Sequence, residues 1–279
     1  MADPSGTRNC YRYCLENLTS ISLVLTQELD GAATVEASAR AVGSGGAMKP
    51  VIVVSNTAGG SGKSTTAHCL AVACAEYGKK VLLIDGDTKR DLTFRLGAEG
   101  SRINFSNLLN VKSGSDLETL TMDERIEFLP SATRPVELPD NCADIFKDLP
   151  EKFDLVIIDT PSSSSAVMNA FFLGATHMVI PISPTLHSFR GAVRAQRQAP
   201  ENCEVFAFMN GCDDSDSSKV IRKEVNADFV VLDCEIPFSQ DLRDAEKTVT
   251  SVLNFAQKSV VSESFRELAY SLLEKLQLI

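Results

Sequence analysis

From residue 49 onward, short apolar runs alternate with stretches in which apolar residues recur at helical spacing. The runs lack the polar alternation of strands with one wet face, so both faces of each strand are expected to be buried. Helices between the strands would cover those faces. The pattern predicts an α/β fold with a single, mostly parallel, twisted sheet of about seven strands and helices on both faces. The predicted strands are 50–55, 80–85, 126–130, 153–159, 177–183, 204–210 and 229–236, and the predicted helices are 63–77, 136–149, 165–173, 186–197, 216–225 and 262–278.

Residues 1–47 differ from the rest of the chain. Residues 9–29 can form one amphipathic helix, and the stretch that ends at 43–47 has the small-residue composition of a flexible linker. Two interpretations stay open: an upstream extension or disordered arm with Met48 as the functional start, or a short helical adaptor or dimer contact. We therefore predict an N-terminal extension over 1–47 and one α/β domain over 48–279.

Composition narrows the class of protein. The chain has 279 residues, of which 44% are hydrophobic, and a formal net charge of −10, which argues against a surface that is entirely a nucleic-acid clamp but allows a local basic patch. The eight cysteines form no Cys-x-x-Cys pair and follow no secretory signal, so we expect reduced thiols in a cytoplasmic protein. No apolar run reaches the length that spans a bilayer.

The segment 51–66 runs from strand to glycine-rich loop to helix. Glycines let backbone N–H groups turn toward a polyphosphate, and the helix that begins near Lys63 points its positive end at the same anion. Lys63 can reach the β- and γ-phosphates, and the Ser64 hydroxyl can bind Mg²⁺. The sequence thus predicts a phosphate-binding loop made by Gly59, Gly60, Ser61, Gly62, Lys63 and Ser64.

Two further strands end in carboxylates. Asp85 and Asp87 follow the apolar run 81–84, and Asp159 follows the run 155–158. The carboxyl ends of parallel strands meet at one edge of a sheet, so these residues are expected near the phosphate loop. Asp85 and Asp87 can hold the waters of a metal ion and orient an attacking water, while Asp159 is the expected Mg²⁺ partner through water. The serines at 162–165 could sense the γ-phosphate.

These elements, in this order and spacing, resemble the ParA/MinD family of deviant Walker ATPases. The resemblance covers about residues 49–278 and includes the segments 79–87, 92–97, 153–161 and 179–184, the pair Ile236-Pro237 and the segment 266–270. Such a family member would bind ATP and Mg²⁺ and hydrolyse ATP. The resemblance implies that Asp87 is the hydrolytic carboxylate, that Asp85 lies on the metal side, and that Lys63, Ser64 and Thr65 hold the nucleotide. It also implies that Asn210 and the stretch from Pro237 border the adenine.

The resemblance further implies a homodimer that sandwiches two ATP molecules. Members of the family cycle on and off a surface, usually bulk DNA or membrane, and a partner stimulates hydrolysis. One residue departs from the pattern: Ala58 stands where the family has a lysine that reaches the partner's nucleotide. Hydrolysis is then weak, or another cation substitutes. Arg190, which follows the strand ending at 183, is the first candidate, and Lys89 and Arg90 are the alternatives.

Three functions compete on this fold. They are a ParA-like ATPase that positions a plasmid or other cargo over nucleoid DNA, a MinD-like regulator that cycles on a membrane, and a metabolic or kinase-like relative. The terminal segment 262–279 carries more acidic than basic residues, which disfavours a membrane anchor. DNA partition therefore leads, with an organelle or a conjugation complex as alternative cargo. The candidate DNA contacts are Arg194, Arg197, Lys219, Arg222, Lys223 and Arg243.

Overall fold

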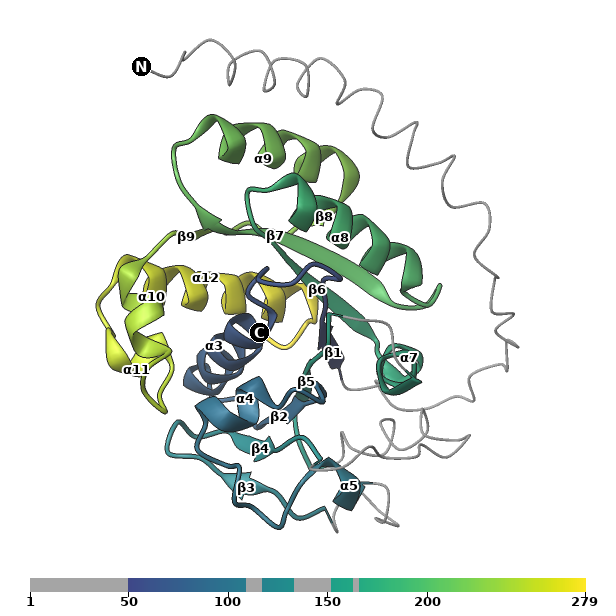
Figure 1. Cartoon of the computed structure of the whole chain (residues 1–279), viewed down its shortest axis with the longest axis vertical. Helices are drawn as coiled ribbons and strands as arrows, with labels where there is room; N and C mark the ends of the chain where they lie inside the picture. Colours follow the sequence, from purple (N-terminus) through teal and green to yellow (C-terminus); the bar gives the residue numbers. More distant parts are fainter. Residues whose placement is uncertain (1–49, 109–116, 133–151, 163–165) are drawn as a thin grey trace, which may run out of the picture. The chain divides into compact units, whose positions relative to one another are not determined.

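A sheet of short apolar strands forms the centre of the fold (Figure 1). The computed structural model describes residues 50–108, 117–132, 152–162 and 166–279, which belong to the structural unit Ala47–Ile279. Every residue of β1 (Val51–Val54), β2 (Val81–Asp85) and β5 (Leu155–Asp159) is buried. This total burial is the reason that these runs show no polar alternation.

The strand order is β3-β4-β2-β5-β1-β6-β7-β8, and β9 pairs with the far end of β7. All pairs are parallel except β3 with β4. β1 is central, between β5 and β6, so the loop after β1 opens at the carboxyl edge of the sheet. The remaining strands are β3 (Leu120–Thr121), β4 (Glu127–Leu129), β6 (His177–Ile182), β7 (Glu204–Cys212), β8 (Val230–Val231) and β9 (Ile236–Pro237).

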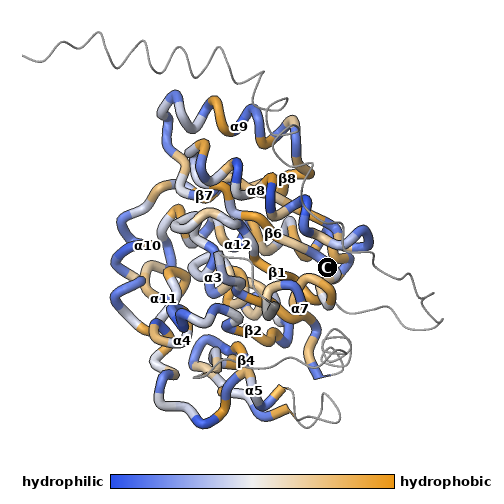
Figure 2. Tube along the Cα trace, turned by 45° about the vertical axis from the view of Figure 1, so that its right-hand side comes forward, coloured by the Kyte–Doolittle hydropathy of each residue, from blue (hydrophilic) through white to orange (hydrophobic). Residues whose placement is uncertain are grey.

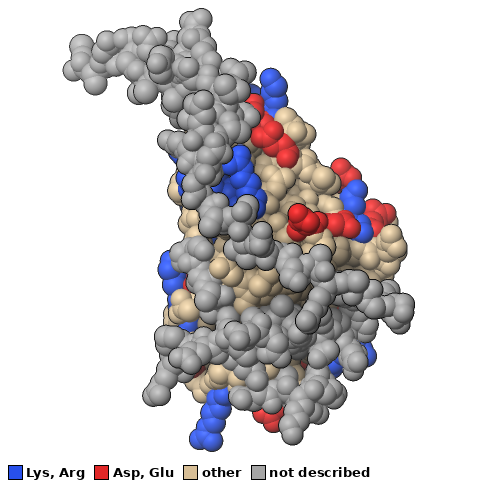
Figure 3. Space-filling model, turned by 90° about the vertical axis from the view of Figure 1, so that its right-hand side faces the viewer, with Lys and Arg blue, Asp and Glu red and all other residues tan. Residues whose placement is uncertain are grey.

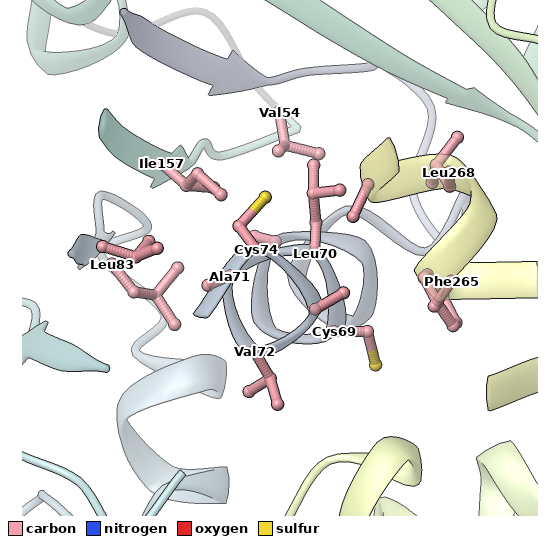
Figure 4. Packing of buried hydrophobic residues seen from close by; sticks show 14 of the residues in the cluster. Val54, Cys69, Leu70, Ala71, Val72, Cys74, Leu83, Ile157, Phe265 and Leu268 are labelled. Carbon is pink, nitrogen blue, oxygen red and sulfur yellow. The ribbon is translucent and has the colours of Figure 1, made fainter. Parts of the chain in front are cut away.

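Helices α3 (Lys63–Glu76) and α12 (Val260–Lys275) pack together on one face of the sheet. Figure 4 shows Leu70 and Cys74 of α3 among side chains of the strands, with Phe265 and Leu268 of α12 beside them. Most side chains of α3 are small or apolar on every side of the helix, as expected of a helix that is buried on several sides. The shorter helices α4 (Asp91–Arg95), α10 (Gln240–Ala245) and α11 (Val252–Phe255) lie around this pair.

The opposite face is covered by α7 (Ala166–Gly174), α8 (Leu186–Gln198) and α9 (Asp216–Asp228), with α5 (Phe105–Leu108) toward the β4 end. A second apolar cluster fills this layer. In Figure 2 the strands and the inward sides of these helices are mostly hydrophobic, whereas blue polar positions lie outside. The protein thus has one sheet between two helical layers, as predicted.

The fold prediction is confirmed, with differences at the edges of the sheet. Residues 229–236 do not form one strand. β8 pairs with Phe206 and Ala207 of β7, whereas β9 pairs with Asn210 and Cys212, and the register shifts between these two at Gly211 (φ 72°). The two-residue strand β3 and the helices α4, α5, α10 and α11, all six residues or shorter, escaped prediction. The predicted extension 1–47 and helix 136–149 lie outside the described residues.

The five cysteines in the described residues are buried free thiols, in agreement with the sequence. They are Cys69, Cys74, Cys203, Cys212 and Cys234, and burial raises the pKa of each to about 12. In the described part of the chain no helix combines the length and the apolar character needed to cross a membrane.

Candidate nucleotide site

The loop between β1 and α3 has the backbone that the sequence predicts for a phosphate cradle. Gly60 (φ 74°) and Gly62 (φ 88°) take left-handed conformations, and Gly62 is the residue that precedes the first turn of α3. A Cβ atom on Gly62 would lie 2.3 Å from the Asn210 side-chain nitrogen. No side chain caps the helix N-terminus, which leaves its N–H groups available to an anion.

Lys63 is buried at the start of α3. Its Nζ donates to the Ala58 carbonyl (3.2 Å) and to the Ser162 hydroxyl (2.9 Å), so the ammonium lies over the loop that it belongs to. Burial lowers the pKa of Lys63, and the negative charges of Asp159 and Asp87 oppose that change. The structure therefore brings together the predicted loop lysine, a serine of the predicted sensing loop and two of the three predicted carboxylates.

Asp159 is fully buried at the end of β5, and neither of its carboxylate oxygens has a hydrogen-bond partner among the described residues. Burial, reinforced by the charge of Asp85, raises the pKa of Asp159 to about 8. The Ser64 hydroxyl faces the same carboxylate and opposes this rise, although it lies outside hydrogen-bonding geometry. A buried carboxylate without a partner is costly unless a cation compensates it, so Asp159 and Ser64 fit the Mg²⁺ site that the sequence predicts.

The described residues contain no group of three or more His, Cys, Asp or Glu side chains that could by themselves enclose a metal ion. This is compatible with Mg²⁺, which proteins commonly bind through one or two carboxylates plus substrate phosphates and water. The Ser64 hydroxyl and the Asp159 carboxylate are therefore enough protein ligands for a Mg²⁺ ion whose other ligands are phosphate and water.

Asp85 pairs in register with Asp159 across β2 and β5, but its oxygens are already used. Oδ1 accepts from the Asp87 N–H (3.0 Å), and Oδ2 accepts from the N–H (2.8 Å) and hydroxyl (2.6 Å) of Thr93. Burial raises the pKa of Asp85 to about 6. These bonds favour a role in shaping the loop after β2, so metal contact by Asp85 stays a prediction with less support than that of Asp159.

Asp87 is half-buried in that loop, where one of its oxygens accepts from the Lys89 N–H (3.0 Å). The other oxygen has no hydrogen bond within the described structure, and the charge of Asp87 acts on the pKa of Lys63. Asp87 thus sits beside the phosphate loop as the sequence predicts, with one oxygen free to orient a water.

Thr65 lies in the first turn of α3 and is held by two side chains. Its hydroxyl donates to Glu246 (2.7 Å) and accepts from Arg95 (3.0 Å), and Arg95 lies 3.8 Å from the same glutamate. Sequence reasoning identified Thr65 but not these partners, because Arg95 and Glu246 come from segments far apart in the chain.

Asn210 and Pro237 are brought together by the pairing of β7 with β9, in which Asn210 is opposite Ile236. The Asn210 amide also donates to the Ser61 carbonyl (2.9 Å). Asn210 therefore lies beside the phosphate loop and Pro237 on the strand paired with it, and the contact of both residues with a base remains a prediction.

Helix α8 approaches the loop from the other side. Gly191 packs so closely that a Cβ atom there would lie 2.3 Å from Asn56 Oδ1 and 2.8 Å from the Ala58 Cβ. Arg190, the residue before it, is exposed. Of the alternative cations, Lys89 is exposed, whereas the Arg90 guanidinium is turned toward the Glu99 carbonyl (3.4 Å). The geometry keeps Arg190 close to the loop, and its catalytic role stays a prediction.

The residues that join the loop to α8 were missed from the sequence. Asn56 donates to the carbonyls of Pro181 and Ser188 (2.9 and 3.1 Å) and accepts from the Ala58 N–H (2.8 Å). One signal could have found the contact, since a glycine inside a helical pattern often marks close packing. Gly191 is such a glycine.

Comparisons with known proteins agree with this geometry. The AAA domain family matches residues 49–198. An uncharacterised ATP-binding protein of Methanocaldococcus jannaschii is 25% identical over 228 residues, which are 78% of this chain and 86% of that protein. The chromosome-partitioning ATPase Soj of Thermus thermophilus is 31% identical over 148 residues, which are 50% of this chain and 57% of Soj.

Among solved structures, the septum site-determining protein MinD of Pyrococcus horikoshii, complexed with Mg-ADP, superposes with a TM-score of 0.70. The match covers 83% of this chain and 98% of that one at 20% identity, so it supports the fold alone. The family match, by contrast, contains the phosphate loop and both acidic strand ends. This chain belongs to the AAA domain family and, within it, to the ParA/MinD type of P-loop ATPases, with Ala58 in place of the signature lysine.

Proposed function

We propose that this protein binds ATP with Mg²⁺ and hydrolyses it slowly, at a rate that a partner protein stimulates. One observation carries the proposal: the Lys63 ammonium and the unpartnered Asp159 carboxylate are buried side by side at the helix N-terminus that the phosphate loop leads into. A polyphosphate with its metal ion would satisfy the helix N–H groups, the carboxylate and the ammonium at once.

The residues divide the chemistry among them. The loop N–H groups and Lys63 hold the β- and γ-phosphates, and Ser64 with Asp159, the latter through water, would hold Mg²⁺. Mg²⁺, when bound, neutralises charge that develops on the phosphate oxygens. Asp87 orients the attacking water with its free oxygen. Ser162 accepts from Lys63 in this structure and would sense the γ-phosphate by exchanging that hydrogen bond for one to the phosphate. Asn210 and Pro237 border the adenine.

The role of Asp87 separates binding from hydrolysis. Asp87→Ala should lower ATP turnover by about 100-fold or more and leave the affinity for ATP within about threefold, because only the water-orienting group is lost. Asp91→Ala, which removes an exposed carboxylate of α4, is the matched control. A mutant that turns over ATP at the parental rate would contradict the assignment.

We further propose that ATP drives formation of a sandwich homodimer in the cytoplasm, and that the dimer positions a plasmid or another cargo over nucleoid DNA. Arg190 then supplies the cation that Ala58 lacks. α8 supports the DNA contact, because Arg194 and Arg197 are both exposed on this helix. Figure 3 shows basic side chains gathered in the upper part of one face, with acidic groups to the right of them.

The six candidate DNA contacts differ in their surroundings. Lys219 pairs with Asp216, Arg222 with Glu235, and the Arg243 guanidinium lies 4.6 Å from the ring centre of Phe238. Arg194 makes no ion pair within the described residues and is exposed. Phosphate binding would cost no existing contact at Arg194, and this favours the α8 side of the patch.

Duplex binding in the presence of ATP tests this function. The affinity should be insensitive to base sequence and should fall by about tenfold or more between roughly 50 and 200 mM salt, since only phosphates are contacted. If the protein shifts no duplex at about 50 mM salt but floats with anionic liposomes, the surface that it binds is a membrane and the DNA function is wrong. The apolar side of α12 would not be the anchor, because Phe265, Leu268 and Leu272 are fully buried in the core.

A further inference from the structure

Thr65, which is predicted to hold the nucleotide, has a hydroxyl that is already engaged by two side chains. It donates its proton to the Glu246 carboxylate (2.7 Å) and accepts from Arg95 Nη1 (3.0 Å). A hydroxyl has one proton, so it cannot donate to Glu246 and to a phosphate oxygen at the same time. A phosphate that binds the Thr65 hydroxyl must therefore displace the carboxylate of Glu246.

Arg95 is held beside the phosphate loop by the short helix that it belongs to. It ends α4, and Thr93 of the same helix donates through its N–H (2.8 Å) and hydroxyl (2.6 Å) to Asp85 at the end of β2. The Arg95 side chain is 16% exposed and contacts the first turn of α3 at Thr65. A guanidinium with so little contact with water attracts an anion more strongly than one on the open surface.

The Arg95 guanidinium is weakly paired for a side chain of such low exposure. Its Nη1 lies 3.8 Å from the Glu246 carboxylate, which is too far for a hydrogen bond. By contrast, Arg222 donates to Glu235 through two nitrogens (2.5 and 2.7 Å). Among the described residues only Nη1 of Arg95 makes a hydrogen bond, so most of its five N–H donors are available to a better acceptor.

The Glu246 side chain can leave Thr65 without a change in the fold. Glu246 ends α10, where its N–H donates to the Leu242 carbonyl (3.2 Å), and the preceding Ala245 is buried. Its side chain is 44% exposed, so a change of rotamer moves the carboxylate into water while the backbone stays in place. Partly exposed ion pairs contribute little to stability, and a phosphate group offers an arginine more charge and more acceptor oxygens than a carboxylate does.

We propose that Glu246 and the nucleotide compete for Thr65 and Arg95: the nucleotide displaces the carboxylate, Arg95 becomes a phosphate ligand, and Glu246 keeps the affinity for nucleotide low. The inference rests on the nucleotide binding proposed above. Lys63 and Ser64 are assigned to the β- and γ-phosphates and to Mg²⁺, which leaves the α-phosphate for Thr65 and Arg95. ADP and ATP share that phosphate, so the competition acts on both nucleotides equally.

Glu246→Gln tests the competition, because it removes the charge and keeps the shape of the side chain. Labelled ADP with Mg²⁺ should bind this variant about fivefold more tightly than the parent, and a chase with unlabelled ADP should show release slowed by about the same factor. A gain in affinity cannot come from partial unfolding. Asp241→Asn, which removes an exposed charge from the same helix, should leave the affinity for ADP within about twofold.

Two variants of Arg95 test its role as a phosphate ligand. Arg95→Ala should weaken ADP binding by about tenfold and Arg95→Lys by about threefold, because lysine keeps the charge but not the planar fork. In the Arg95→Ala background, Glu246→Gln should gain at most about twofold, since the cation that it frees is gone. With ATP, each single variant should shift KM while kcat changes by less than about twofold, because the α-phosphate does not react.

The outcomes separate this inference from the proposed nucleotide binding. If the parent binds ADP and Glu246→Gln binds it equally or more weakly, the competition is overturned and the nucleotide function stands. If Glu246→Gln gains as much in the Arg95→Ala background as alone, Arg95 is not the phosphate ligand. If the parent binds no ADP, the nucleotide function and this inference both fail. Should Arg95→Ala not fold, Arg95→Lys supports the same comparison.

Discussion

Two groups of buried charged residues contact helix α3, and they differ in how their polar atoms are satisfied. At the first turn, both oxygens of Asp159 lack a partner among the described residues. One turn later, His68 meets Glu124 (2.6 Å), and Glu124 also accepts from Ser251 N–H (2.8 Å), Ser251 hydroxyl (2.6 Å) and Asn254 (2.8 Å). Only Nδ1 of His68 is left without a partner in the described part of this second group.

The pKa values follow the same division. Burial raises the pKa of Asp159, because no strong donor holds its charge. Burial alone would also raise the pKa of Glu124, but hydrogen bonds from His68 and Ser251 outweigh it and lower the value below the ordinary one. A buried carboxylate with a full set of donors stabilises the fold, whereas one without donors is available to a ligand. Four substitutions, taken from the largest expected effect to the smallest, test this distinction.

Lys63→Ala should weaken ATP binding by about 1000-fold, because no other lysine of the described residues hydrogen-bonds within the loop. Equilibrium binding of a labelled ATP analogue measures the loss, and the midpoint of thermal unfolding should change by only a few degrees. Lys258→Ala, which removes an exposed lysine, is the control. Unchanged affinity in a folded mutant would show that the residues at the first turn of α3, Lys63 and Asp159, do not bind the nucleotide.

Glu124→Ala should lower the free energy of unfolding by about 3–5 kcal/mol, since it strands a buried histidine and leaves the donors of Ser251 and Asn254 unpaired. Urea unfolding without nucleotide measures the change, with the exposed Glu201→Ala as reference. At urea concentrations just below the unfolding transition, the folded fraction of the mutant should still bind ATP with near-parental affinity. A loss of binding without a loss of stability would reverse the roles assigned to the two groups.

Asp159→Asn should have the opposite effect on stability. In the presence of a chelator at pH 7 it should raise the free energy of unfolding by on the order of 1–4 kcal/mol, because folding no longer has to protonate a carboxylate that is ionised in the unfolded chain. In the parent, Asp159 is protonated in the folded state up to about pH 8 and ionises in the unfolded chain from about pH 4. The contribution of Asp159 to the free energy of unfolding is therefore fully present at acid pH and is lost as the pH rises from about 4 to about 8.

Unfolding curves from pH 5 to pH 8 measure this slope, which the Asn variant should flatten. The exposed Asp228→Asn should leave both the slope and the stability at pH 7 unchanged. The same Asp159→Asn protein should lose Mg²⁺-dependent ATP binding. A destabilised apoprotein would mean that Asp159 has a structural partner after all.

Arg190→Ala should weaken ATP-dependent dimerisation by about tenfold and leave nucleotide binding to the monomer nearly intact. Dimer fraction against ATP concentration measures the effect, with Arg102→Ala, on an exposed loop, as control. The double change with Ala58→Lys should recover part of the dimer. Because Ala58 is buried beneath Gly191, the recovery is limited by how far the new side chain can leave the loop. Parental dimerisation would transfer the role to Lys89 or to no residue.

Much of the sheet and of the site was predictable because the signals are local. Fully apolar runs predicted the buried strands, and the run of glycines before Lys63 predicted the loop. The register of Asp85 with Asp159 follows from parallel pairing, which brings strand ends to one edge. Short elements such as β3 and α10 have too few residues for a periodic signal, so they could not be predicted from the sequence.

What the tertiary structure alone decided is which polar atoms are satisfied. The sequence marks Asp159 as the end of an apolar strand and Glu124 as one of several charged residues between two strands, and neither position tells how many donors surround the carboxylate. Only the packing of α11 and α3 around Glu124 supplies four donors, and only the absence of such packing leaves Asp159 without one. In the same way, the sequence identifies Gly191 as a glycine in a helix, but the contact with Asn56 depends on where α8 crosses the loop. Sequence patterns report burial along the chain, whereas hydrogen-bond satisfaction depends on atoms that are far apart in the chain and meet only in the folded structure.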